Sequence, residues 1–189
     1  MQALTATLQP SRPRPRLASV LGVLLAVVTA ACTSGAAPSR STTTGGAQDV
    51  AVEPNASVVR VVDGDTIVVD VDGREETVRL IGVDTPETVR PDSPVECFGP
   101  EASGRTHQLL PPGTPVRLER DAEARDDYGR LLAYVVRASD GLFVNRDLVA
   151  GGFAQPMTFP TNTAHTSELV GAARAAERAG LGLWAACGG

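Results

Sequence analysis

Two short acidic motifs stand in the first half of the sequence. Asp63 and Asp65 belong to the segment DGDT, and Asp84 and Glu87 belong to the segment DTPE. Carboxylate oxygens are the ligands that hard cations such as Ca²⁺ prefer, and such a cation neutralises and orients an anionic phosphodiester. A further carboxylate can take a proton from the attacking water. The motifs therefore predict a metal site at Asp65 and Asp84, with Glu87 as the base.

Two arginines, Arg79 and Arg130, could hold the phosphate and meet the charge that grows in the transition state. All 17 basic residues of the chain are arginine, which stays charged at any ordinary pH. The net charge is −5, and the first 31 residues carry three arginines and no acid, so the remainder is more acidic still. This balance argues against a protein that coats nucleic acid by bulk electrostatics, but it allows an enzyme with a local cationic site.

The elements that would position these residues are mainly strands. Strands are expected at residues 57–62, 66–71, 75–83, 115–119, 131–137 and 142–144, and helices at residues 100–110, 145–150 and 165–179. No pair of strands is spaced as a βαβ unit, which excludes a doubly wound sheet. The order instead suits a small barrel with peripheral helices.

The hairpin between the second and third strands allows the distance between the acids to be estimated. Residues 72–73 are Asp-Gly, a strong signal for a two-residue turn. Counting back from this turn places Asp65 opposite Leu80. Asp84 would then lie about 13 Å further along a flat sheet, at about 3.3 Å per residue. A shared metal site therefore requires a bend or bulge near Gly82.

The N-terminal segment is typical of an export signal. Residues 12–31 combine arginines, an apolar run and small residues before Cys32. The apolar run is short for a membrane-spanning helix. Residues 28–32 (VTAAC) resemble a bacterial lipobox, so we expect Cys32 to carry lipid and to hold the protein on the outer side of the cell membrane. The alternative is a plain signal peptide that is cut near Ala31 and releases a secreted protein.

The chain divides into three expected parts on this basis. These are a signal peptide of the lipoprotein type at 1–31, the lipidated cysteine and a flexible linker at 32–54, and one folded domain at 55–187. The folded domain holds two cysteines, Cys97 and Cys187. Because an exported protein meets oxidising conditions, a disulfide between them is predicted, with two unpaired thiols as the alternative. Two histidines and no closely spaced cysteine pair give little basis for a zinc site.

Four segments, in this order, carry a resemblance to a known family. They are VDGDTIVVDVDGREETVRLIGVDTPET (62–88), ECFGPEAS (96–103), DDYGRLLAYV (126–135) and LVAGGFA (148–154). Together they resemble the staphylococcal nuclease (thermonuclease) family over about residues 57–185. The resemblance implies an α+β, mainly β, OB-fold: a five-stranded barrel with three peripheral helices. It also implies Ca²⁺-dependent cleavage of DNA and RNA that leaves 3′-phosphate ends.

The resemblance further implies a role for each residue of the motifs. The Ca²⁺ ligands would be Asp65, Asp84 and the backbone carbonyl of Thr85. Asp63 would support these ligands, and Glu87 would be the general base. Arg79 and Arg130 would bind and polarise the phosphate.

One region departs from the family pattern. The prototype of the family carries tyrosines after the second helix that pack against the bound nucleotide, whereas residues 155–160 read QPMTFP. Phe159, together with Tyr128, is therefore the candidate for stacking on a base.

Two further hypotheses of other classes remain open. One is a non-catalytic OB-fold lipoprotein that binds nucleic acid, and the other is an envelope lipoprotein with a structural role. The complete set of acids and arginines favours the enzyme. We therefore expect a monomeric nuclease with nucleic acid as substrate, Ca²⁺ as cofactor and a lipid anchor on Cys32.

Overall fold

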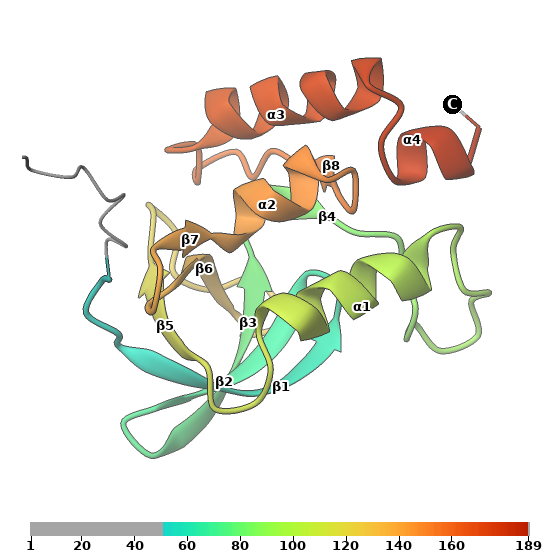
Figure 1. Ribbon diagram of the computed structural model, residues 1–189. Helices are drawn as coiled ribbons and strands as arrows, with labels where there is room; N and C mark the ends of the chain where they lie inside the picture. Colours follow the sequence, from blue (N-terminus) through green and yellow to red (C-terminus); the bar gives the residue numbers. More distant parts are fainter. Residues whose placement is uncertain (1–50, 189) are drawn as a thin grey trace, which may run out of the picture. The chain divides into compact units, whose positions relative to one another are not determined.

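A computed structural model of the chain describes residues 51–188 (Figure 1). The expected signal peptide, Cys32 and most of the expected linker lie outside the described residues. No helix between residues 51 and 188 is both long enough and apolar enough to cross a membrane.

Five strands form a closed barrel. They are β1 (Ala56–Asp63), β2 (Thr66–Val71), β3 (Arg74–Leu80), β5 (Pro115–Glu119) and β6 (Leu131–Arg137). The strands follow the order β3-β2-β1-β5-β6 with antiparallel neighbours, and a parallel pairing of β3 with β6 closes the ring. A short strand, β7 (Leu142–Phe143), extends the sheet beside β6. The predicted five-stranded OB-type barrel is confirmed.

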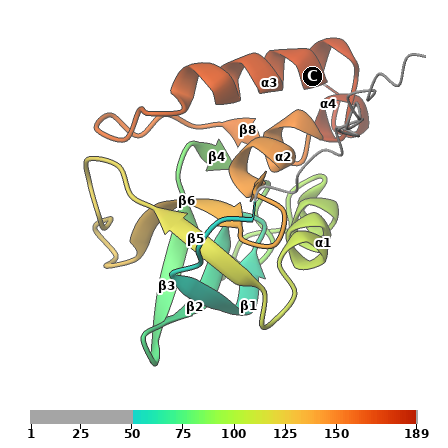
Figure 2. The same ribbon diagram turned by 60° about the vertical axis from the view of Figure 1, so that its left-hand side comes forward.

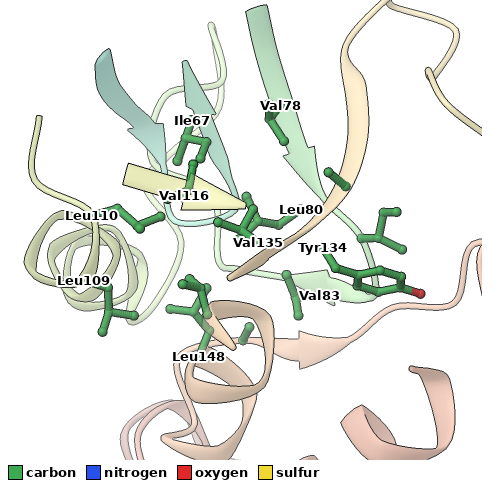
Figure 3. Close-up of a cluster of buried hydrophobic side chains, with 14 of the residues drawn as sticks. Ile67, Val78, Leu80, Val83, Leu109, Leu110, Val116, Tyr134, Val135 and Leu148 are labelled. Carbon is green, nitrogen blue, oxygen red and sulfur yellow. The ribbon is translucent and has the colours of Figure 1, made fainter. Parts of the chain in front are cut away.

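The core is almost entirely aliphatic, as a sequence with only 4% aromatic residues requires. Strand β2 reads TIVVDV, and its first four residues are buried. β-Branched residues pack well on a pleated surface, so this run favours a central strand. Figure 3 shows side chains from the barrel strands and from two helices pointing into one cluster, among them Ile67, Leu80, Val135 and Leu148.

Three helices lie where they were predicted. They are α1 (Gly99–Leu109), α2 (Val144–Ala150) and α3 (Thr166–Arg178). Helix α1 lies beside β1, and α2 packs between β6 and α3, so that α3 lies outside α2 in both views (Figures 1 and 2). A fourth helix of one turn, α4 (Leu183–Ala186), was not predicted. The disulfide predicted between Cys97 and Cys187 is present, with 5.9 Å between the Cα atoms, and it joins the residues before α1 to the end of α4.

The expected strand at residues 75–83 is interrupted at residues 81–82. Strand β3 ends at Leu80, and Gly82 takes a positive φ of 78°. A side chain at Gly82 would also clash with Leu169 of α3. The chain then forms β4 (Val83–Asp84), which pairs with β8 (Gln155–Pro156) in a separate two-stranded sheet. The backbone therefore bends at the glycine where a shared metal site required a bend.

Candidate active site

A pocket of about 560 Å³ opens beside the end of β3 and the strand β4. Its lining includes every residue that the sequence singled out for metal binding, catalysis or base stacking: Asp63, Asp65, Arg79, Asp84, Thr85, Glu87, Tyr128, Arg130 and Phe159. Residues that lie far apart in the sequence thus share one concave surface, which is the usual form of a ligand site.

The hairpin register brings the first acids to this pocket. The N–H of Leu80 donates to the carbonyl of Asp65 at 2.9 Å, which confirms the predicted pairing. Beyond Leu80, the bend at Gly82 turns the chain back, so that the N–H of Thr85 donates to Oδ2 of Asp65 at 3.1 Å. The separation of about 13 Å expected for a flat sheet is therefore removed by the bend.

Arg79 lies at the centre of the site, and only 8% of its side chain is exposed. Its Nη1 donates to the carbonyls of Leu80 and Val83 at 2.8 and 2.7 Å. Its Nη2 lies 3.0 Å from Oδ2 of Asp65 and 2.9 Å from Oδ1 of Asp84. One guanidinium nitrogen thus bridges the two carboxylates that were predicted to share a cation.

The donor set around this bridge fits a hard cation. Asp84 is 59% exposed, and its Oδ2 accepts no hydrogen bond within residues 51–188. The pKa of Asp84 is raised by partial loss of hydration in the pocket. Arg79 opposes this shift, and the negative charges of Asp65 and Glu96 add to it. Carboxylates that repel one another in this way gain from a divalent cation bound between them.

The protein would supply only part of the coordination shell. Within residues 51–188, no three His, Cys, Asp or Glu side chains are grouped to hold a metal ion. Asp65 and Asp84 would therefore be joined by the carbonyl of Thr85 and by water, which is usual for Ca²⁺. The Thr85 hydroxyl, which is buried close by, has no hydrogen-bond partner among residues 51–188.

Glu87 faces the pocket with 21% of its side chain exposed. Its Oε1 accepts the backbone N–H groups of Thr88, Val89 and Arg90 at 3.1, 2.9 and 3.1 Å. Its Oε2 has an ion pair with Arg90 at 3.3 Å. A hydrogen bond with the side chain of Asp63, and next the N–H of Val89, lower the pKa of Glu87. Glu87 is therefore ionised at neutral pH. Of its two carboxylate oxygens, Oε2 has fewer contacts than Oε1.

Asp63 ties the DGDT turn to the loop after β4. It is 6% exposed, and its carboxylate accepts the hydroxyl of Thr88 at 2.6 Å and the N–H of Thr88 at 3.2 Å. Burial raises the pKa of Asp63, and the hydrogen bond with Glu87 raises it too, whereas the bonds from Thr88 lower it. Asp63 therefore contacts Gly64, which precedes Asp65, and Thr88, which follows Glu87.

Arg130 enters the pocket from the loop before β6. Its Nε donates to Oδ2 of Asp126 at 2.6 Å, and its backbone N–H donates to Oδ1 at 2.9 Å. The guanidinium lies 5.5 Å from the ring centre of Tyr128, which is 86% exposed. Because Nε carries the contact with Asp126, the two terminal nitrogens are left for a ligand.

The Phe159 ring lies next to Arg79, with 5.9 Å between the guanidinium carbon and the ring centre. Met157 is beside it, with its sulfur 3.8 Å from Nη2 of Arg79. The two aromatic rings predicted to stack on bases therefore each lie against one of the two arginines predicted to bind the phosphate.

Sequence reasoning missed several residues of the site. Gly64 is one, because a Cβ there would lie 2.6 Å from the Thr85 hydroxyl oxygen. Thr106 of α1 is another, since its hydroxyl donates to the carbonyl of Gly64 at 2.6 Å. Arg90 and Glu96 also line the pocket. The glycine inside DGDT was a visible signal, whereas the other three depend on contacts between distant segments.

Comparison with known proteins agrees with this geometry. Residues 77–186 match the family described as "Staphylococcal nuclease homologue". The thermonuclease of Staphylococcus intermedius is 46% identical over 67% of this chain and 74% of its own length. The thermonuclease of Staphylococcus hyicus is 40% identical over 70% of this chain and 76% of its own length. Endonuclease YncB of Bacillus subtilis is 31% identical over 91% of this chain and 92% of its own length.

The resemblance seen in the four sequence segments is therefore confirmed by the family match, by the identities and by the barrel itself. The chain belongs to the staphylococcal nuclease family.

Proposed function

We propose that this protein is a Ca²⁺-dependent endonuclease that acts on DNA and RNA outside the cytoplasm and leaves 3′-phosphate ends. Its family and its thermonuclease and endonuclease relatives make it a nuclease, a hydrolase of phosphodiester bonds. The observation that carries the proposal is that Asp65 and Asp84 meet at one cationic nitrogen of Arg79. They do so in the same pocket as Glu87 and Arg130.

Asp65, Asp84 and the carbonyl of Thr85 would hold the cation. A bound Ca²⁺ would neutralise the phosphodiester and orient it for attack. Oxygen donors of this kind are shared by several hard cations, so the choice of Ca²⁺ rests on the family resemblance.

The chain's own side chains supply the remaining chemistry. Glu87, which is kept ionised by its lowered pKa, takes the proton of the attacking water at Oε2. The terminal nitrogens of Arg130 hold the phosphate and stabilise the extra negative charge of the transition state. Arg79 places a second positive charge beside the two aspartates. Phe159 and Tyr128, which both line the pocket, offer ring faces on which bases can stack.

The proposed location rests on the N-terminal sequence. An export signal at 1–31, lipid on Cys32 and a linker at 32–54 would hold the domain at 55–187 outside the cell membrane as a monomer. The Cys97–Cys187 disulfide supports an oxidising compartment, because disulfides seldom persist in the cytosol. Replacement of Cys32 by Ala should move the protein from the membrane fraction to the medium. Retention of the Cys32→Ala variant in the membrane would contradict the lipid anchor.

A cleavage assay tests the function. The purified protein should degrade single-stranded DNA and RNA with Ca²⁺, stop when a chelator is added, and leave 3′-phosphate ends. Glu87→Gln should lose at least about 100-fold in kcat, the usual loss for a general base, with an unchanged circular dichroism spectrum. Asp84→Asn should raise the Ca²⁺ concentration needed for half-maximal rate. Binding of nucleic acid without cleavage, whatever the divalent ion, would instead favour the non-catalytic module.

A further inference from the structure

We propose that Arg90 binds a second phosphate of the substrate, next to the one that is cleaved. The inference rests on the proposed nuclease function and extends it to the length of substrate that the site recognises. Neither of the two acidic motifs contains Arg90, which lies in the loop that joins β4 to α1 (Figure 1).

Arg90 reaches the pocket with a guanidinium that is almost unoccupied. Its side chain lines the pocket and is 62% exposed. Within the part of the chain that the structure describes, its guanidinium has one ion pair, from Nη2 to Oε2 of Glu87 at 3.3 Å. The guanidinium donates no hydrogen bond to any residue between 51 and 188. A planar set of N–H donors is therefore free to bind an anion in the cleft.

The other two arginines of the pocket are held more firmly. Both terminal nitrogens of Arg79 contact protein oxygens. Arg130 is fixed to Asp126 through Nε and its backbone N–H. The single ion pair of Arg90 leaves 62% of the arginine side chain exposed, and ion pairs open to solvent are weak, so a phosphate can replace Glu87 as its partner. Arginine is well suited to this exchange, because its fork matches two phosphate oxygens.

Because the pocket is acidic, a polynucleotide needs a further positive charge in it to bind its second phosphate. The lining carries eight carboxylates and three guanidiniums. The acids are Asp63, Asp65, Asp84, Glu87, Glu96, Glu123, Asp126 and Asp127. A polynucleotide has a negative charge at each linkage, so its second phosphate would meet these acids unless a cation stood there. Arg79 and Arg130 serve the cleaved phosphate, which leaves Arg90.

The exchange has a consequence for the base. When Arg90 moves to a phosphate, Oε2 of Glu87 loses its ion pair with Arg90. Binding of a substrate with a second phosphate would therefore also release the base. A substrate that lacks the second phosphate would neither bind Arg90 nor release Glu87 from it.

The test compares three dinucleotides that each contain one cleavable linkage. One has no further phosphate, one has a 5′-phosphate and one has a 3′-phosphate. In the wild type, one terminal phosphate should lower KM by about three- to tenfold, as expected for one charge-assisted contact. Arg90→Ala should abolish this gain, and Arg90→Lys should retain part of it. With single-stranded oligonucleotides, Arg90→Ala should reduce the slope of log KM against log salt by about 0.7.

Arg60→Ala is the matched control. Arg60 is 56% exposed and has an ion pair with Glu75 at 3.0 Å, but it does not line the pocket. This variant loses one positive charge and one exposed ion pair, and it should keep the wild-type gain from the terminal phosphate and the wild-type salt slope.

The outcomes decide the inference independently of cleavage. The inference would be overturned if the terminal phosphate still lowered KM in Arg90→Ala or failed to lower KM in the wild type. It would also be overturned if Arg60→Ala lost this decrease in KM as fully as Arg90→Ala. The same dinucleotides are also titrated by calorimetry with Ca²⁺ and with chelator. If the wild type cleaves nothing, the proposed function fails, and the ratio of Kd values for phosphorylated and unphosphorylated ligands still decides the role of Arg90.

Discussion

The main chain of Glu87 is held on both sides by Glu96. The N–H of Glu96 donates to the carbonyl of Glu87 at 2.9 Å, and Oε2 of Glu96 accepts the N–H of Glu87 at 3.0 Å. The loop that carries the proposed base is therefore closed by two reciprocal hydrogen bonds. Such positioning matters because small displacements of a reacting group lower the rate steeply.

Glu96→Ala should lower kcat by about three- to tenfold with little change in KM, because it releases the backbone of Glu87. Glu96→Gln keeps an oxygen acceptor and should restore most of the rate. Glu119→Ala removes an exposed acid outside the pocket and serves as the control. Steady-state kinetics measure the rates, and amide hydrogen exchange at Glu87 should be faster in Glu96→Ala alone. Equal losses of kcat in Glu96→Ala and Glu96→Gln would show that the charge of Glu96 matters, and not its hold on the backbone of Glu87.

Gly64→Ala should destabilise the fold and weaken the metal site together. The added Cβ would lie 2.6 Å from the hydroxyl oxygen of Thr85 and 2.8 Å from its Cβ. Overpacking of this kind costs about 1–3 kcal/mol. Gly104→Ala in α1 is the control, because its Cβ would meet nothing within 4 Å. This change should stabilise the helix by about 0.5–1 kcal/mol. Urea unfolding and the Ca²⁺ dependence of the rate measure both effects.

Reduction of the disulfide should lower the free energy of unfolding by about 2–5 kcal/mol. Cys97 and Cys187 are separated by 90 positions, so the bond restricts a large loop of the unfolded chain. The variant in which both cysteines are Ser should match the reduced wild type and should not respond to reductant. Chemical unfolding with and without reductant provides the measurement. Identical stability of the oxidised and reduced wild type would contradict the prediction.

Asp121 should give the fold a dependence on acidic pH. Its carboxylate accepts the N–H of Ala164 at 2.9 Å and the hydroxyl of Tyr134 at 3.2 Å. The first of these bonds is the main reason that the pKa of Asp121 is lowered. A carboxyl whose pKa is lowered in the folded state stabilises the fold at pH values above its pKa in the unfolded chain, about 3.9. This stabilisation is lost as the pH falls through the folded pKa.

Asp121→Ala should therefore be less stable than the wild type by about 1–2 kcal/mol at pH 7. The difference should shrink as the pH falls below about 4, because both proteins then lack the charge. Asp127→Ala is the control, since the Asp127 side chain accepts no hydrogen bond between residues 51 and 188. Thermal unfolding at a series of pH values tests the prediction. A difference that stays constant down to acid pH would show that the ionised form of Asp121 is not responsible.

The sequence predicted those parts of the fold that local rules govern. The Asp-Gly turn at 72–73 placed Asp65 opposite Leu80, and the backbone hydrogen bond between them confirms it. The need for a bend near Gly82 followed from the same count. The predicted strand at 131–137 is also present as β6, and Tyr134 within it is 2% exposed.

Features that depend on distant partners were not predictable in this way. Strand β8 and helix α4 are too short to leave a periodic pattern, and β8 exists because it pairs with β4. The two hydrogen bonds between Glu96 and Glu87 join separate segments, and so does the hydrogen bond from Thr106 to Gly64. No rule of local spacing identifies such pairs.

The barrel closes where β3 runs parallel to β6, and this seam also unites the two proposed phosphate-binding arginines. Arg79 lies in β3 opposite Leu132, whereas Arg130 directly precedes β6. A chain that had formed only the β1–β2–β3 meander would contain the acidic motifs but would have no second arginine beside them. Hydrolysis should therefore require the closed barrel, and partly folded chains should not cleave nucleic acid until β3 pairs with β6.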